Sequence, residues 1–309
     1  MIARSAPLGL LCITACAAAR AEATVRIAVC QARLRWYADA ADFTAATRML
    51  VVAAAQQHPD LIVFPEDYGT PLVALGLPVG PPLSSLGEAA SALAGAELDA
   101  QARKWGASQT RAVFLLQGPR MRDAYLSTFS ALAREFRVTI AAGSICLPAG
   151  GGPGVYNTTF LLGPDGAVIG EQRKVNLIDL EGPEGLDLSH GSRDDLRVFD
   201  TPLGRIALCI CLDCFDADIG RRLADLGAQI VVDPSANPKL FTPEEEAQNR
   251  TGLWARVQEH GYIGVQCFAV GEFLGLPFRG RSWVIRPGEV LAQAQSDDRE
   301  EVVVAKVAP

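Results

Sequence analysis

Apolar residues recur along the chain in short, nearly continuous runs that are separated by segments with helical periodicity. The runs predict strands at residues 25–31, 61–64, 138–143, 158–162, 205–212, 228–233, 262–269, 281–285 and 302–306. Helices are predicted between them at residues 41–57, 124–136, 218–226 and 244–259. Strands that are apolar along their whole length are usually covered on both faces. Their alternation with helices predicts an α/β domain.

A break in composition after residue 24 divides the chain into two predicted parts. Residues 1–23 start with Met-Ile-Ala-Arg, continue with an apolar stretch and end in small residues, as a short secretory leader does. Residues 13–16 (ITAC) also resemble a bacterial lipoprotein box. Alternatively, translation starts at Val25, where the first predicted strand begins. We interpret residues 1–24 as a leader-like or non-native extension and residues 25–309 as one domain.

Composition and charge indicate which partners and which cellular location to expect. The 309 residues carry a net charge of −7 and contain no block of Lys and Arg, which argues against a nucleic-acid partner. No stretch after residue 24 is apolar for long enough to cross a bilayer. Six of the eight cysteines follow residue 24, and their spacing is not that of a small disulfide-bonded domain. We therefore expect reduced thiols, which favours a cytoplasmic location. A genuine leader would instead predict export or lipid anchoring.

Residues 69–123 fit the alternation of strands and helices poorly. They open with an apolar run rich in Pro and Gly and continue through an Ala-rich segment that is expected to be helical. This stretch is interpreted either as a lid or entrance wall, or as an ordinary surface excursion.

Histidine is scarce, which limits the catalytic sites that the chain can build. His58 precedes Pro59 at a predicted helix end and His260 lies in a turn, so both are interpreted as structural. A Ser-His-Asp or Cys-His site would therefore require His190, in the loop of residues 187–191. Three histidines cannot form a His-rich metal cluster, and no metal is expected.

A cluster of cysteines closes the predicted strand at residues 205–212. A thiol between a strand and the following helix faces the positive end of the helix dipole, which lowers the pKa of the thiol. Strand alternation places Cys209 and Cys211 on one face, and only Cys211 lies at the strand end, so Cys211 is the better nucleophile. A buried structural role, a redox pair of Cys211 with Cys214 and a soft-metal site remain alternatives.

Two charged residues adjoin apolar strands. Glu66 follows the strand at residues 61–64, and Lys174 precedes Val175. Taken alone, each is more often a solvated loop charge than a catalytic group.

Three segments, in this order and at this spacing, resemble the nitrilase (carbon–nitrogen hydrolase) superfamily. They are residues 61–66 (LIVFPE), 156–177 (YNTTFLLGPDGAVIGEQRKVNL) and 201–213 (TPLGRIALCICLD). Residues 25–31 and 281–292 are also similar to the family, so the resemblance extends from about residue 25 to the C-terminus.

The resemblance implies a four-layer α-β-β-α sandwich, with two mixed sheets packed face to face, and a homodimer or larger assembly. It implies Cys211 as nucleophile, Glu66 as general base, and Lys174 with the backbone N–H of Leu212 as oxyanion donors. Glu181 takes the place of a second, supporting glutamate, with Glu184 as the alternative. No metal or organic cofactor is implied.

Departures from the family pattern bear on the substrate. Asn176 stands where the family usually has His, and residues 217–218 are Ala-Asp in place of Pro-Glu. Leu212-Asp213 follows the cysteine where nitrilases proper tend to have Trp-Glu. We therefore expect hydrolysis of a small linear amide, with N-carbamoyl hydrolysis, nitrile hydrolysis and acyl transfer to an amine as alternatives. The rival from another class is a catalytically silent binding module on the same fold.

Overall fold

The computed structural model describes residues 24–77, 85–93 and 95–309. The predictions made for residues 1–23 lie outside these ranges.

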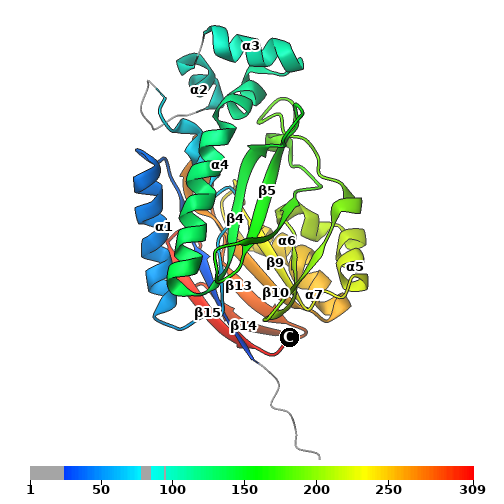
Figure 1. The fold of residues 1–309 in the computed structure, drawn as a ribbon. Coiled ribbons are helices and arrows are strands. Elements are labelled where there is room, and N and C mark those ends of the chain that lie inside the picture. The colour runs from blue at the N-terminus through cyan, green and yellow to red at the C-terminus, as the bar shows by residue number, and fades with distance from the viewer. Residues whose placement is uncertain (1–23, 78–84, 94) are drawn as a thin grey trace, which may run out of the picture.

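Two mixed six-stranded sheets form the centre of the described part of the chain (Figure 1). The first sheet, in the order β15–β1–β3–β4–β5–β6, consists of Glu301–Val307, Val25–Gln31, Leu61–Val63, Thr139–Pro148, Val155–Leu162 and Val168–Arg173. The second, in the order β14–β13–β10–β9–β8–β7, consists of Glu289–Gln293, Trp283–Arg286, Ile263–Phe268, Ile230–Ser235, Gly204–Leu208 and Val198–Thr201. In each sheet three neighbouring strands are parallel and the outer pairings are antiparallel.

The sheets pack face to face through an apolar layer. Ile27 and Val63 of the first sheet share this layer with Val232 and Val265 of the second, and all four are buried. Within β1 the neighbouring residue Ala28 belongs instead to the core under the helices, because successive strand residues point to opposite faces.

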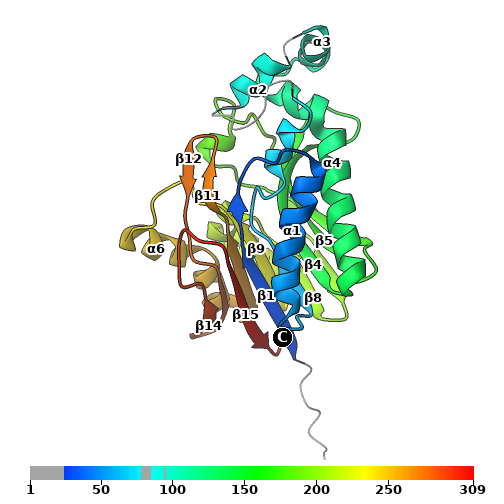
Figure 2. The ribbon, with the colours of Figure 1, turned by 90° about the vertical axis from the view of Figure 1, so that its left-hand side faces the viewer.

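Helices cover the two outer faces (Figure 2). Helices α1 (Ala40–Ala55) and α4 (Gln109–Phe136) pack on the first sheet, and α5 (Ala217–Asp225) and α7 (Ala255–His260) pack on the second. The predicted α-β-β-α sandwich is therefore confirmed.

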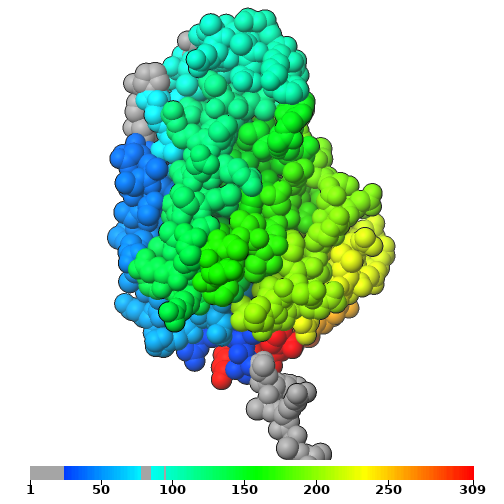
Figure 3. Space-filling view, in the orientation of Figure 1, coloured from blue at the N-terminus to red at the C-terminus, as the bar shows by residue number. Residues whose placement is uncertain are grey.

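The stretch at residues 69–123 contains more regular structure than its sequence suggests. It forms the 3-10 helix η1 (Thr70–Ala74), α2 (Leu86–Ala92), α3 (Ala96–Trp105) and the first half of α4. Helix α4 continues through Gly118 and Pro119, and Gly118 fits because a Cβ there would lie 2.3 Å from the ring of Pro148. Helices α2 and α3 lie beyond the end of the sheets (Figure 1), and the space-filling view shows this part of the chain in cyan at one end of the molecule (Figure 3).

Other boundaries also differ from the predictions. The helix predicted at residues 244–259 is divided into α6 (Pro243–Asn249), the π-helical turn η5 (Arg250–Trp254) and α7, with non-helical torsions at Gly252. A small third sheet of β2 (Arg33–Leu34), β11 (Val270–Phe273) and β12 (Leu276–Phe278) was not predicted. Short 3-10 helices are η2 (Asp179–Glu181), η3 (Arg193–Asp195) and η4 (Cys211–Phe215).

None of the helices in the described ranges combines the length and apolarity that crossing a membrane requires.

Candidate active site

A buried lysine lies between two buried glutamates beyond the ends of two strands of the first sheet. Glu66 follows β3, Lys174 follows β6, and Glu181 ends η2. The Nζ atom of Lys174 lies 2.7 Å from Oε1 of Glu66 and 2.7 Å from Oε2 of Glu181. The three side chains are at most 3 % exposed, and the fold has brought Lys174 next to Glu66, which lies 108 positions earlier in the sequence.

Asn157 connects the two glutamates from β5. Its Nδ2 atom donates to Oε1 of Glu66 and to Oε1 of Glu181, both at 2.9 Å. Sequence reasoning quoted this residue but gave it no role. The signal in the sequence was a carboxamide directly before the strand predicted at residues 158–162, because an amide that becomes buried there needs hydrogen-bond partners.

Burial and mutual charge set the protonation of this cluster. Burial raises the pKa of Glu66 to about 8, with the positive charge of Lys174 opposing the rise and Glu181 adding to it. Burial alone would lower the pKa of Lys174, but the charges of Glu66, Cys211 and Glu181 outweigh it and hold that pKa well above its ordinary value. The lysine therefore stays an ammonium, while Glu66 can exchange a proton near neutral pH.

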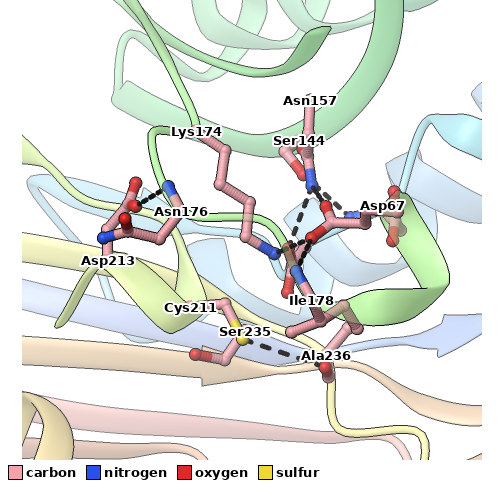
Figure 4. A network of polar contacts seen from close by, with 12 residues as sticks. Asp67, Ser144, Asn157, Lys174, Asn176, Ile178, Cys211, Asp213, Ser235 and Ala236 are labelled. Atoms are coloured by element: carbon pink, nitrogen blue, oxygen red, sulfur yellow. Dashed lines mark hydrogen bonds and ion pairs between the residues drawn. The ribbon is translucent and has the colours of Figure 1, made fainter. Parts of the chain in front are cut away.

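Cys211 lies across from Lys174 on a sharp turn (Figure 4). Its φ is +48°, a left-handed conformation that is uncommon for a residue with a side chain. Strand β8 ends at Leu208, so the strand predicted at residues 205–212 is too long and both Cys209 and Cys211 lie beyond it. The accessibility is nevertheless as expected, since Cys211 is half-buried and Cys209 is buried.

The expected lowering of the pKa of the Cys211 thiol is also wrong. Only a 3-10 turn follows Cys211, and α5 begins later, at Ala217. Burial and then the negative charge of Glu66 raise the pKa of Cys211 well above its ordinary value, and Lys174 only opposes this. The resting group is thus a thiol, and it needs a base to become a nucleophile.

The turn exposes one backbone donor beside the thiol. The first amides of a helix have no acceptor within it. The N–H of Cys211 donates to Oδ1 of Asp233 at 2.7 Å. The N–H of Leu212 has no acceptor among the described residues. Leu212 therefore offers the free amide that an oxyanion next to Cys211 would require.

Asp213 links the cysteine turn to the lysine segment. Its fully buried carboxylate accepts hydrogen bonds from the N–H groups of Val175 (3.0 Å to Oδ2) and Asn176 (2.6 Å to Oδ1). Burial raises the pKa of Asp213 to about 6, against the lowering effect of these amides. Asp213 thus fixes Lys174 relative to Cys211, a role that sequence reasoning did not assign.

The family departures at residues 176, 217 and 218 fall at the start of α5. The side chain of Asn176 donates to Asp216, the N-cap of that helix, at 3.2 Å. Ala217 is the first helical residue, where Pro would also fit, and Asp218 keeps a negative charge in the first turn. These changes therefore preserve the local helix start.

The remaining candidates take no part in the hydrogen bonds of the Lys174 side chain. Glu184 is exposed, so the structure places Glu181 and not Glu184 next to Lys174. His190 is exposed, and its Nδ1 lies 2.8 Å from the carbonyl oxygen of Val175. Cys209 and Cys214 are buried free thiols. Within the described ranges, no three His, Cys, Asp or Glu side chains are arranged so that they could hold a metal ion.

The fold and this site define a hydrolase-like α-β-β-α sandwich with a cysteine opposite a buried Glu–Lys pair. The family model for carbon-nitrogen hydrolases matches residues 26–309. The chain therefore belongs to the carbon–nitrogen hydrolase family, as its sequence predicted.

Curated relatives and solved structures agree with this assignment. The chain is 32 % identical over 185 residues to the omega-amidase NIT2 of Bos taurus, which covers 58 % of this chain and 64 % of that protein. It is 32 % identical over 177 residues to the omega-amidase NIT2 of Homo sapiens, which covers 55 % and 62 %. The match thus spans a little under two thirds of the length of these relatives.

Similar folds occur in two bacterial proteins. A carbon-nitrogen hydrolase from Helicobacter pylori G27 superposes with a TM-score of 0.69 at 21 % identity, covering 93 % of this chain and 90 % of that one. A cysteine-to-alanine variant of the amidase from Nesterenkonia sp. AN1, in complex with butyramide, gives a TM-score of 0.65 at 21 % identity, covering 92 % and 91 %.

Proposed function

We propose that this protein is an amidase that hydrolyses a small linear amide through a Cys211 thioester. The observation that carries the proposal is the buried Lys174 ammonium, which Glu66 and Glu181 hold in place opposite the half-buried Cys211 thiol. A buried, paired cation is costly to build and is therefore better explained by chemistry than by stability.

Acylation begins with a proton transfer. The Glu66 carboxylate takes the proton of the Cys211 thiol, and Sγ then attacks the carbonyl carbon of the amide. The carbonyl oxygen becomes an oxyanion that accepts hydrogen bonds from Nζ of Lys174 and the N–H of Leu212. Protonated Glu66 gives its proton to the amide nitrogen, the C–N bond breaks, and ammonia or an amine leaves the thioester behind.

Deacylation uses the same groups, with water in place of the thiol as the nucleophile. Glu66 takes a proton from water, and the oxygen attacks the thioester carbon. The same two donors stabilise the second oxyanion. Its collapse breaks the C–S bond, the sulfur regains the proton from Glu66, and the carboxylic acid is released. In this scheme Glu181 and Asn157 touch no reacting atom, and their part is to orient Lys174 and Glu66.

The substrate class that we favour is the ω-amide, an amide at the end of a short chain. This choice is supported by the relatives described as omega-amidases and by Leu212-Asp213 after the cysteine. Carbamoyl amino acids and nitriles are the competing substrates.

The test is a screen for ammonia release across ω-amides, carbamoyl amino acids and nitriles, with the Cys211→Ala protein as control. We expect ammonia from at least one ω-amide with the unaltered protein and none with the control. Release that is equal in both proteins, or release from nitriles alone, would contradict the proposal. A complete lack of turnover together with ligand binding would favour the silent binding module.

Two further proposals concern the whole chain. We propose that residues 25–309 fold as one domain without the preceding extension, and that the protein forms a homodimer or a larger assembly. Sedimentation of the purified protein tests the second proposal, and a monomer at micromolar concentration would contradict it.

A further inference from the structure

A row of three buried polar side chains crosses the second sheet behind Cys211. Asp233 pairs with Gln266 in the β9–β10 register, and Gln266 pairs with Trp283 in the β10–β13 register. Their side chains therefore project on one face of three neighbouring strands. They are at most 3 % exposed.

Hydrogen bonds connect this row to the backbone of the cysteine. Nε1 of Trp283 donates to Oε1 of Gln266 at 2.6 Å, and Nε2 of Gln266 donates to Oδ2 of Asp233 at 2.8 Å. The other carboxylate oxygen, Oδ1, accepts the N–H of Cys211 at 2.7 Å. It also accepts the hydroxyl of Ser235 at 3.0 Å.

The direction of every bond in the row is fixed by its two ends. The indole N–H of Trp283 and the backbone N–H of Cys211 can only donate. Gln266 must therefore turn its oxygen toward Trp283 and its NH₂ group toward residue 233. Residue 233 must then accept a hydrogen bond at each of its two terminal side-chain atoms. A carboxylate can do so, whereas a carboxamide has only one acceptor atom.

The left-handed conformation of Cys211 explains why a hydrogen bond to its backbone would be needed. A residue with a side chain at φ +48° is strained, and it persists only where its surroundings hold it. The bond from the Cys211 N–H to Asp233 acts directly on that residue. It also leaves the neighbouring Leu212 N–H as the free donor.

We propose that Asp233 is a positioning residue for the nucleophile. Its acceptor-only carboxylate, oriented by Gln266 and Trp283, holds Cys211 in the turn that presents Sγ to Glu66 and Lys174. The inference deepens the proposed function and rests on it for catalysis, but the reactivity of the Cys211 thiol tests it separately.

The experiment compares Asp233→Asn with the double variant Asp233→Asn/Gln266→Glu in the full-length protein. The single variant sets an NH₂ group against a donor. In the double variant every donor again has an acceptor. The total charge of the row is unchanged, but the carboxylate now stands at position 266, farther from Cys211. The rate of Cys211 alkylation by iodoacetamide is measured by peptide mass spectrometry, alongside kcat and KM for the best amide of the screen.

We expect the single variant to lose on the order of 100-fold in kcat and in alkylation rate, with KM changed much less, because a small displacement of a reacting group has this effect. The double variant should return to within about threefold of the unaltered protein. Thr47→Val is the matched control. It removes buried hydrogen bonds to Phe43 and Tyr68 under α1, and it should lower the melting temperature without changing the alkylation rate.

Unchanged alkylation and kcat in a folded Asp233→Asn protein would overturn the proposal. So would a double variant that folds but recovers neither rate, because the negative charge next to Cys211 and not its hydrogen bond would then be decisive. If the unaltered protein alkylates at Cys211 but hydrolyses no compound of the screen, the proposed function fails, and the alkylation rates alone decide the role of Asp233.

Discussion

The Nζ atom of Lys174 lies 2.7 Å from Oε1 of Glu66, and neither side chain is more than 2 % exposed. An exposed ion pair contributes little to stability, whereas removal of one partner from a buried pair leaves an uncompensated charge. The relationship between these two residues therefore affects both stability and the proposed chemistry, and the predictions below separate the two.

Replacement of Lys174 by Met should abolish hydrolysis and also destabilise the protein. Glu66 and Glu181 would then face each other without a cation, and we expect a loss of about 3–5 kcal/mol in the free energy of unfolding. The double variant Lys174→Met/Glu181→Gln removes one of these charges and should regain part of the stability without regaining activity. Urea unfolding and ammonia release measure the two effects. An active Lys174→Met protein would refute the role of Lys174 in oxyanion stabilisation.

The pH dependence of activity should reflect Glu66. Because burial raises its pKa to about 8, the fraction of ionised base falls as the pH decreases below that value. We expect kcat/KM to decrease about tenfold per pH unit on this acid limb. Glu66→Gln should show no turnover at any pH while it still binds the amide. A profile that is flat between pH 6 and pH 8 would be inconsistent with Glu66 as the base.

The same shift predicts a change in stability. The pKa of Glu66 is higher in the folded protein than its ordinary value of 4.5, so the folded state binds the proton more tightly. The stabilisation from this group is complete below pH 4.5 and is lost as the pH rises through about 8. Relative to Glu66→Gln, which does not titrate, the unaltered protein should become progressively less stable over this window. Denaturant unfolding of both proteins at several pH values measures the difference, and a difference independent of pH would contradict it.

Among the three clustered cysteines, only Cys211 should be essential. Cys211→Ala removes the nucleophile and should lower kcat by about three orders of magnitude or more. Cys209→Ala and Cys214→Ala remove buried thiols of the core and should keep appreciable activity. Loss of activity confined to Cys214→Ala, with Cys211→Ala fully active, would overturn the assignment. Circular dichroism of each variant shows that the fold is retained.

A chain that begins at Val25 should be as stable and as active as the full chain. Strand β1 is paired with β15 from its first residue, with Val25 opposite Val307, and this pairing needs no preceding residue. Thermal unfolding and the ammonia assay test the prediction. Insolubility of the shortened protein would show that residues 1–24 are required by the domain.

The sequence by itself was enough to predict the architecture and to select Glu66, Lys174 and Cys211 as the candidate site. Strands of nearly pure Val, Ile and Leu must be covered on both faces, and the spacing of the segments around Glu66, Lys174 and Cys211 matched one family. Local sequence patterns gave wrong bounds for helices and strands where tertiary contacts outweigh the intrinsic propensity of the residues. Helix α4 continues through Gly118 and Pro119, and the missing side chain of Gly118 leaves room for the ring of Pro148. Strand β8 ends at Leu208, before the cysteines.

Only the tertiary structure decided how the candidate site is arranged. Whether the thiol of Cys211 is activated depends on burial and on the charge of Glu66, two properties of neighbours distant in sequence, and they reversed the pKa shift expected from the turn alone. The bridging amide of Asn157 and the carboxylates of Asp213 and Asp233 likewise acquire their roles from the donors that meet them in space. A hydrogen bond depends on distances and directions that the order of residues does not contain.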